Sequence, residues 1–267
     1  MDALIAGERA GQHVARCQQL AVGAALCAAL VAAPAHATAL DDAVAEVSDS
    51  AYPVLRALKP ETFGPFVTKV GDLVLKAVPP AKLSKAVDQG LDYFLSVPPA
   101  KVGAVASATK EAFSGLSVDT CVLVPLPPAA LFNKFVAADA VAQVDAAKLK
   151  SFAEEARGVV SAIPRKGDLA CLPPSAALTK ASLAQADAAA AADPAAAKAF
   201  GKAAGAALKS IPPGQLFPLA GDANQLTRGA SLDERQRFKK AGVRIEAVAK
   251  RAAAAQAAAP GPAVGEP

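Results

Sequence analysis

VPPAKL at residues 78–83 joins a proline pair to a sequence of good helix formers, and four later segments repeat the arrangement. They are VPPAKV at 97–102, LPPAAL at 126–131, LPPSAAL at 172–178 and IPPGQL at 211–216. Proline supplies a helical φ in the first turn, where its missing amide hydrogen costs nothing, and it disfavours the α conformation in the residue before it. Each pair is therefore predicted to end one segment and begin a helix.

The composition predicts the same architecture. Hydrophobic residues make up 53% of the 267-residue chain but aromatic residues only 4%, so the core must be built largely from Ala, Leu and Val. Alanine has the highest helix propensity. Together with the proline pairs, this predicts an all-α fold, a compact multi-helix bundle or array of about 8–10 helices. We expect a single helical domain over residues 38–259.

Three segments between the proline pairs carry more specific expectations. Residues 40–58 have a helical pattern that we expect to be interrupted at Pro53. Residues 131–163 predict two helices with a joint near 138–145. Residues 122–126 favour β structure, but nearby prolines predict an extended connector rather than part of a sheet.

The N-terminal stretch LAVGAALCAALVAAPAHA, residues 20–37, is typical of an export signal. Its uncharged run, 20–33, is shorter than the ~18 to 20 apolar residues that span a bilayer. A proline then breaks the helix, and small residues stand at the −3 and −1 positions that a signal peptidase requires. We predict that residues 1–37 are a cleavable targeting segment and that cleavage falls between Ala37 and Thr38, with Ala39 as the nearby alternative cut.

The sequence ARCQQLAVGAALCAALVAAPAHA, residues 15–37, resembles the lumen-targeting half of thylakoid precursors. This resemblance implies the chloroplast thylakoid lumen and a transit peptide ahead of the signal. Arg9 and Arg16 are offset by Asp2 and Glu8, whereas a bacterial secretion signal normally has a clearer positive start. The bacterial periplasm is the alternative compartment.

Cleavage at this site would leave a mature chain without histidine, because His13 and His36 both precede it. The mature chain would then lack Ser-His-Asp and Cys-His nucleophile systems and histidine metal sites. The sequence also has no glycine-rich phosphate loop and no zinc or EF-hand spacing. We therefore predict no enzyme activity, catalytic residue, cofactor or metal. The net charge of +4 is too small to indicate nucleic-acid binding.

Two cysteines follow the predicted cleavage site, Cys121 and Cys171, each just ahead of a proline pair. In an oxidising compartment, an even number of cysteines in matching contexts favours a disulfide. The alternative is two separate buried thiols, which behave as small hydrophobic side chains.

A C-terminal helix is predicted over residues 232–258, because Ser231 and Glu234 have the spacing of a capping box. Its apolar stripe consists of Phe238, Ala241, Ile245, Val248 and Ala252. On the basic face, the residues predicted to bind an acidic protein surface or an anionic membrane are Arg237, Lys239, Lys240 and Arg244. The alternative is a core helix with a solvated outer face. Residues 260–267 are expected to form a disordered tail.

These observations lead to three functional hypotheses. The first is a non-enzymatic, soluble thylakoid-lumen protein that helps assemble or maintain a photosynthetic membrane complex through a protein partner or peripheral membrane contact. In general class it resembles helical lumenal accessory proteins, such as the four-helix extrinsic subunit of photosystem II. The second is a periplasmic helical protein of binding or envelope-associated type. The third is a carrier that encloses a lipid or an isoprenoid pigment.

Overall fold

The protein is predominantly helical, as the computed structural model shows for residues 37–136 and 144–258, the part of the chain that the structure describes. Its helices are α2 (Ala37–Arg56), α3 (Pro60–Ala77), α4 (Pro80–Leu95), α5 (Pro99–Ala112), α6 (Ala129–Val136), α8 (Ala146–Val160), α9 (Ser175–Ala190), α10 (Pro194–Leu208), α11 (Pro213–Leu226) and α12 (Leu232–Ala258). Its strands are β1 (Val122–Pro125), β2 (Arg165–Lys166) and β3 (Leu169–Leu172). The predicted all-α class is confirmed, and the ten helices of this part fall within the expected number.

All five proline pairs stand at a helix start, as predicted. Three helices, α4, α5 and α11, begin with the second proline of their pair, and two, α6 and α9, begin directly after it. Four N-cap residues are prolines, with φ between −54° and −59° and ψ between 134° and 149°. This extended conformation redirects the chain, and the N-cap carbonyl still accepts a helical hydrogen bond, as from the Leu83 amide to Pro79 at 3.1 Å.

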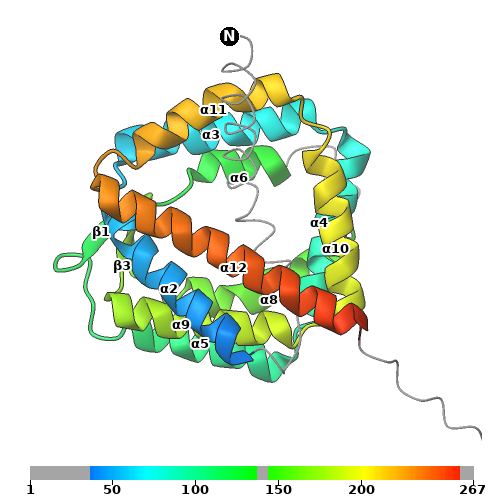
Figure 1. The fold of residues 1–267 in the computed structure, drawn as a ribbon, viewed down its shortest axis with the longest axis horizontal. Helices are drawn as coiled ribbons and strands as arrows, with labels where there is room; N and C mark the ends of the chain where they lie inside the picture. The colour runs from blue at the N-terminus through cyan, green and yellow to red at the C-terminus, as the bar shows by residue number, and fades with distance from the viewer. Residues whose placement is uncertain (1–36, 137–143, 259–267) are drawn as a thin grey trace, which may run out of the picture.

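The chain folds back on itself so that its elements pair in nested order. Helix α2 packs against α12, α3 against α11, α4 against α10 and α5 against α9, while β1 pairs with β3. Figure 1 shows these pairs arranged as a ring, with α12 crossing in front. Helices α6 and α8 therefore belong to the innermost part of the chain, between β1 and β3.

Side-chain hydrogen bonds link the nested pairs, three of them between the two helices and one, at α4 and α10, to Ser210 just after the end of α10. From the outermost pair inward, the bonded residues are 198, 153, 128 and 86 positions apart. They are Arg244 with Glu46, Lys69 with Asp222, Lys82 with Ser210, and Lys101 with Asp187. The steady fall in separation means that the second half of the chain retraces the first in the antiparallel direction.

The core is divided into three clusters, and each joins helices from the first half of the chain to helices from the second half. One joins α4 to α9 and α10 through Tyr93, Val97, Ala188, Ala192 and Ala197. A second joins α2 to α9 and α12 through Leu40, Ala43, Val44, Ala186 and Ile245. The third consists of Val78, Leu83, Ala207 and Ile211. It connects α4 and the turn before α4 with α10 and the turn after α10. Small residues fill many buried positions, in agreement with the alanine-rich composition.

The prediction that residues 122–126 form a connector outside any sheet is wrong. β1 is an edge strand of a three-stranded antiparallel sheet with the order β1-β3-β2. An edge strand tolerates proline because one side of its backbone is unpaired, and Pro125 ends this strand. The signal that could have revealed the sheet is Gly167-Asp168 between β2 and β3, a two-residue hairpin in which Gly167 has a φ of 60°.

Pro53 does not interrupt the first helix, contrary to expectation. It lies inside α2, three residues before the helix ends at Arg56. A proline so close to the end of a helix removes only one backbone hydrogen bond of the last turns, so the helix continues to Arg56. The joint expected near 138–145 lies mostly outside the described residues; on either side of it, α6 ends at Val136 and α8 begins at Ala146.

Candidate functional site

Helix α12 begins with the predicted capping box. The Ser231 amide donates to the Glu234 carboxylate at 2.7 Å, and the Glu234 amide donates to the Ser231 hydroxyl at 3.2 Å. The hydrogen bond from the Ser231 amide lowers the pKa of the Glu234 carboxyl below its usual value, because it stabilises the charged form. The start of α12 is therefore held locally, before any tertiary contact is made.

The inner face of α12 packs on α2 through most of the predicted stripe. Ala241 and Ile245 are 0% and 1% exposed, and Val248 is half-buried beside them. Phe238, expected on the same stripe, is 38% exposed. It lies about one turn closer to the N-terminus than Ala241.

The structure divides the four predicted basic residues of α12 into two pairs. Arg244 donates to Glu46 of α2, and Arg237 lies 2.8 Å from Asp233 one turn earlier on α12. Lys239 and Lys240 are exposed, and neither has an ion pair within the described ranges. Two of the predicted residues thus contribute to contacts inside the protein, and two remain available to a partner.

The outer face of α12, defined here as Leu232, Lys239, Lys240, Val243 and Arg251, also carries apolar side chains that the sequence pattern did not single out. Leu232 is 64% exposed and Val243 is 50% exposed. The signal for them was present in the sequence, since both stand opposite Ala241 and Ile245 on a helix of 3.6 residues per turn. Arg251 is exposed on the same side and has no ion pair among the described residues.

The predicted cysteine pair lies at disulfide distance. Cys121 and Cys171 form a bond with a Cα–Cα distance of 5.5 Å and enclose the chain segment that contains α6 and α8. Cys171 belongs to the central strand β3 and is only 2% exposed. The disulfide therefore closes the innermost end of the nested fold, where β1 and β3 meet.

Other predictions fall wholly or partly outside the described residues. The targeting segment is outside them except for Ala37, where α2 begins next to the predicted cleavage site at Thr38. The C-terminal tail also lies outside them. Within residues 37–136 and 144–258, no helix is long and apolar enough to cross a membrane. In the same ranges, no three Asp, Glu, His or Cys side chains gather in a group that could hold a metal ion.

A separate cluster attaches α8 to α4. The Lys148 ammonium lies 2.8 Å from Asp88 and 2.6 Å from Asp92, and these hydrogen bonds raise the pKa of Lys148 well above its usual value. Phe152 packs edge-on against Phe94 with ring centroids 4.7 Å apart. The arrangement is a structural clamp, since a lysine held in its charged form is a poor general base.

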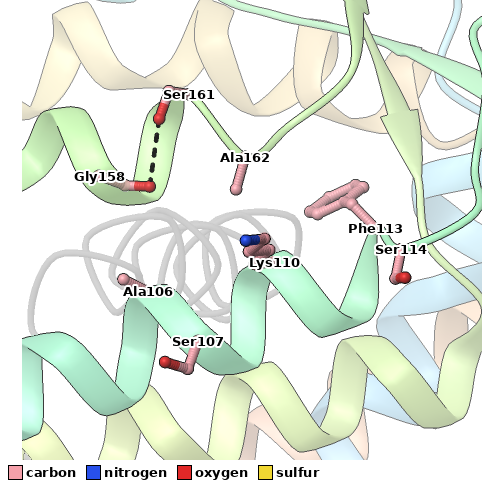
Figure 2. Close-up of a pocket in the computed structure, with 8 residues that line it drawn as sticks. All are labelled: Ala106, Ser107, Lys110, Phe113, Ser114, Gly158, Ser161 and Ala162. Carbon is pink, nitrogen blue, oxygen red and sulfur yellow. Dashed lines mark hydrogen bonds between the residues drawn. The ribbon is translucent and has the colours of Figure 1, made fainter.

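An open depression of about 520 Å³ lies between α5 and the end of α8. Figure 2 shows that Lys110 and Phe113 line it and that the Ser107 hydroxyl points away from Lys110. The Ser161 hydroxyl donates to the Gly158 carbonyl at 3.3 Å. Half of the eight lining residues carry a hydroxyl or ammonium group, so the depression does not suit a hydrophobic ligand. The orientation of the Ser107 hydroxyl does not suit a serine–lysine nucleophile pair with Lys110.

Comparisons with known protein families, with curated proteins and with solved structures find no match for this chain. The outer face of α12 combines unpaired cations with exposed apolar side chains, an arrangement suited to binding a partner.

Proposed function

We propose that this protein is an exported, non-enzymatic accessory protein that binds an acidic surface of a membrane complex through α12. The observation that carries the proposal is that Lys239 and Lys240 remain exposed and without an ion pair in the described structure, while neighbouring Arg237 and Arg244 are paired. Unpaired surface cations attract acidic partners over about 8 Å at physiological ionic strength.

The compartment we propose is the thylakoid lumen, with the bacterial periplasm as the alternative. Two observations support export in either case. One is the uncharged run followed by small residues at 20–37, and the other is the bond between Cys121 and Cys171. Disulfides persist in oxidising compartments and are rare in reducing ones. In the lumen, the partner would be a photosynthetic membrane complex that this protein helps to assemble or maintain.

The test is association of the mature protein with isolated membranes. Replacing Lys239→Gln and Lys240→Gln together should lower the fraction of protein that sediments with thylakoid membranes. For the unchanged protein, 0.5 M salt should lower this fraction too, because the electrostatic screening length falls from about 8 Å to about 3–5 Å. The matched control is Lys202→Gln with Lys209→Gln, which removes the same charge from an exposed lysine of α10 and from the exposed lysine at its C-cap.

Both double variants should keep the helical content of the unchanged protein, because exposed lysines contribute little to stability. Equal sedimentation of the two variants, at low and high salt, would contradict the proposal. In that case α12 would act only as a scaffold helix.

A further inference from the structure

The geometry of the outer face of α12 indicates which kind of acidic partner can bind there. Leu232, Lys239 and Val243 follow one another along a single line of the helix, because positions separated by three, four, seven or eleven residues share a face. Leu232 and Val243 are eleven residues apart, about 16 Å along the axis. Lys239 stands between them, and Lys240 and Arg251 flank the line.

Exposed apolar side chains are concentrated on this helix. Among the described residues, six large hydrophobic side chains are exposed, and three of them belong to α12: Leu232, Phe238 and Val243. The remaining three are spread over other elements, on Val122, Val160 and Leu208. Phe238 belongs to the inner stripe, so Leu232 and Val243 are the two exposed apolar residues that share the outer face. Single exposed apolar residues are ordinary, but two on one helix face beside unpaired cations favour an interaction surface.

Helix α12 is positively charged because its seven basic residues outnumber its three acidic residues, and each of those acids already has an interaction. Asp233 pairs with Arg237, Glu234 accepts from the Ser231 amide, and Glu246 interacts within the protein. An incoming partner therefore meets cations and apolar groups, and complementarity requires that it present carboxylates beside apolar side chains.

We propose that the outer face of α12 docks an acidic amphipathic helix of a partner protein. This inference rests on the proposed function and names the partner's chemistry. A lipid surface fits less well, since a helix lying in a membrane keeps its cations at the polar edge. Lys239 instead lies between Leu232 and Val243, where insertion would bury its ammonium, whereas a partner helix can place a carboxylate opposite it.

A second copy of this chain is also a poor occupant. Two such faces would bring Lys239, Lys240 and Arg251 against the same cations of the other copy, and like charges that meet at an interface repel each other. Charge complementarity thus selects an acidic partner, and the length of the line selects a helix of about three turns.

The experiment uses the mature full chain with a photoreactive benzoylphenylalanine in place of Val243, irradiated on thylakoid membranes. The inference expects a cross-link to a protein segment that has a helical pattern of apolar residues flanked by Asp or Glu. As a second measurement, Leu232→Ser with Val243→Ser should weaken membrane association about tenfold, which corresponds to roughly 1.4 kcal/mol for two partly buried side chains. Val160→Ser with Leu208→Ser removes two exposed apolar side chains elsewhere and should leave association unchanged.

The outcomes separate this inference from the proposed function. Cross-links to lipid, or equal binding of the unchanged protein to vesicles of 70% phosphatidylcholine and 30% phosphatidylglycerol, would overturn the helix partner while leaving the basic face in use. Loss of association in the lysine variant without loss in the Leu232/Val243 variant would also overturn it. No loss in either variant would overturn both proposals.

Discussion

Gly229 lies directly against the backbone of Ala57: a Cβ atom placed on Gly229 would be 2.8 Å from the Ala57 carbonyl oxygen. Ala57 follows the end of α2, and Gly229 stands in the turn before α12. This contact therefore joins the first and last helices of the described chain at one end of their shared interface. Only glycine allows so close an approach without a shift of the backbone.

We expect Gly229→Ala to destabilise the protein by about 1–3 kcal/mol, because a backbone oxygen cannot move aside as a side-chain end can. The matched control is Gly205→Ala on α10, where an added Cβ meets nothing within 4 Å. There the gain in helix propensity should stabilise the protein by about 0.5–1 kcal/mol. Urea unfolding followed by circular dichroism measures both changes, and a neutral Gly229→Ala would contradict the close contact.

Removal of the disulfide should destabilise the protein by about 4 kcal/mol on the chain-entropy model, because the bond closes a loop with a sequence separation of 50. The variant Cys121→Ser with Cys171→Ser should melt at a lower temperature than the oxidised protein. A reducing agent should lower the melting temperature of the unchanged protein and leave that of the variant unaffected. Two alkylatable thiols at these positions in freshly isolated protein would show that the bond does not form.

The clamp between α8 and α4 should make the stability of the protein depend on pH in the alkaline range. Folding raises the pKa of Lys148, so its contribution is complete below the unfolded value of about 10.4 and is lost as pH rises through the folded value. Lys148→Met should loosen α8, seen as faster amide hydrogen exchange at 146–160. The stability difference between unchanged protein and variant should shrink in the alkaline range. A difference independent of pH would assign the effect to packing alone.

The capping box of α12 should make the stability of the protein depend on pH in the acid range. Folding lowers the pKa of the Glu234 carboxyl, so its contribution is present above the unfolded value of about 4.3 and is lost as pH falls through the folded value. Glu234→Gln should abolish that dependence, and Ser231→Ala should increase amide exchange in the first turn of α12. Unchanged exchange in both variants would mean that packing on α2 alone holds this end of the helix.

The mature chain should begin at Thr38, because cleavage after Ala37 satisfies the small-residue requirement. N-terminal sequencing of protein isolated from its native compartment measures this directly. Recovery of native protein that begins at Met1 would contradict export and, with it, the proposed compartment.

Local signals in the sequence were enough to predict most helix starts. The proline pairs and the Ser231–Glu234 box act within one helical turn, and the structure confirms all of them. The cysteine pair was also predictable, because matching sequence context and compartment chemistry both favour it. The sheet was missed because β1 and β3 are far apart in the chain and each is only four residues long.

The sequence by itself determined the class of the protein and the starts of most of its helices, since proline geometry and alanine propensity act on neighbouring residues. Only the tertiary structure decided how those helices pair and which charges remain free. Arg244 is paired because Glu46, 198 residues away, lies beside it, whereas Lys239 faces outward. Helical periodicity places Lys239 opposite the stripe of Ala241 and Ile245, but it does not reveal that Arg244 meets a carboxylate of α2. Their difference arises from the nested return of the chain, which brings α2 against one face of α12 and leaves the other face exposed.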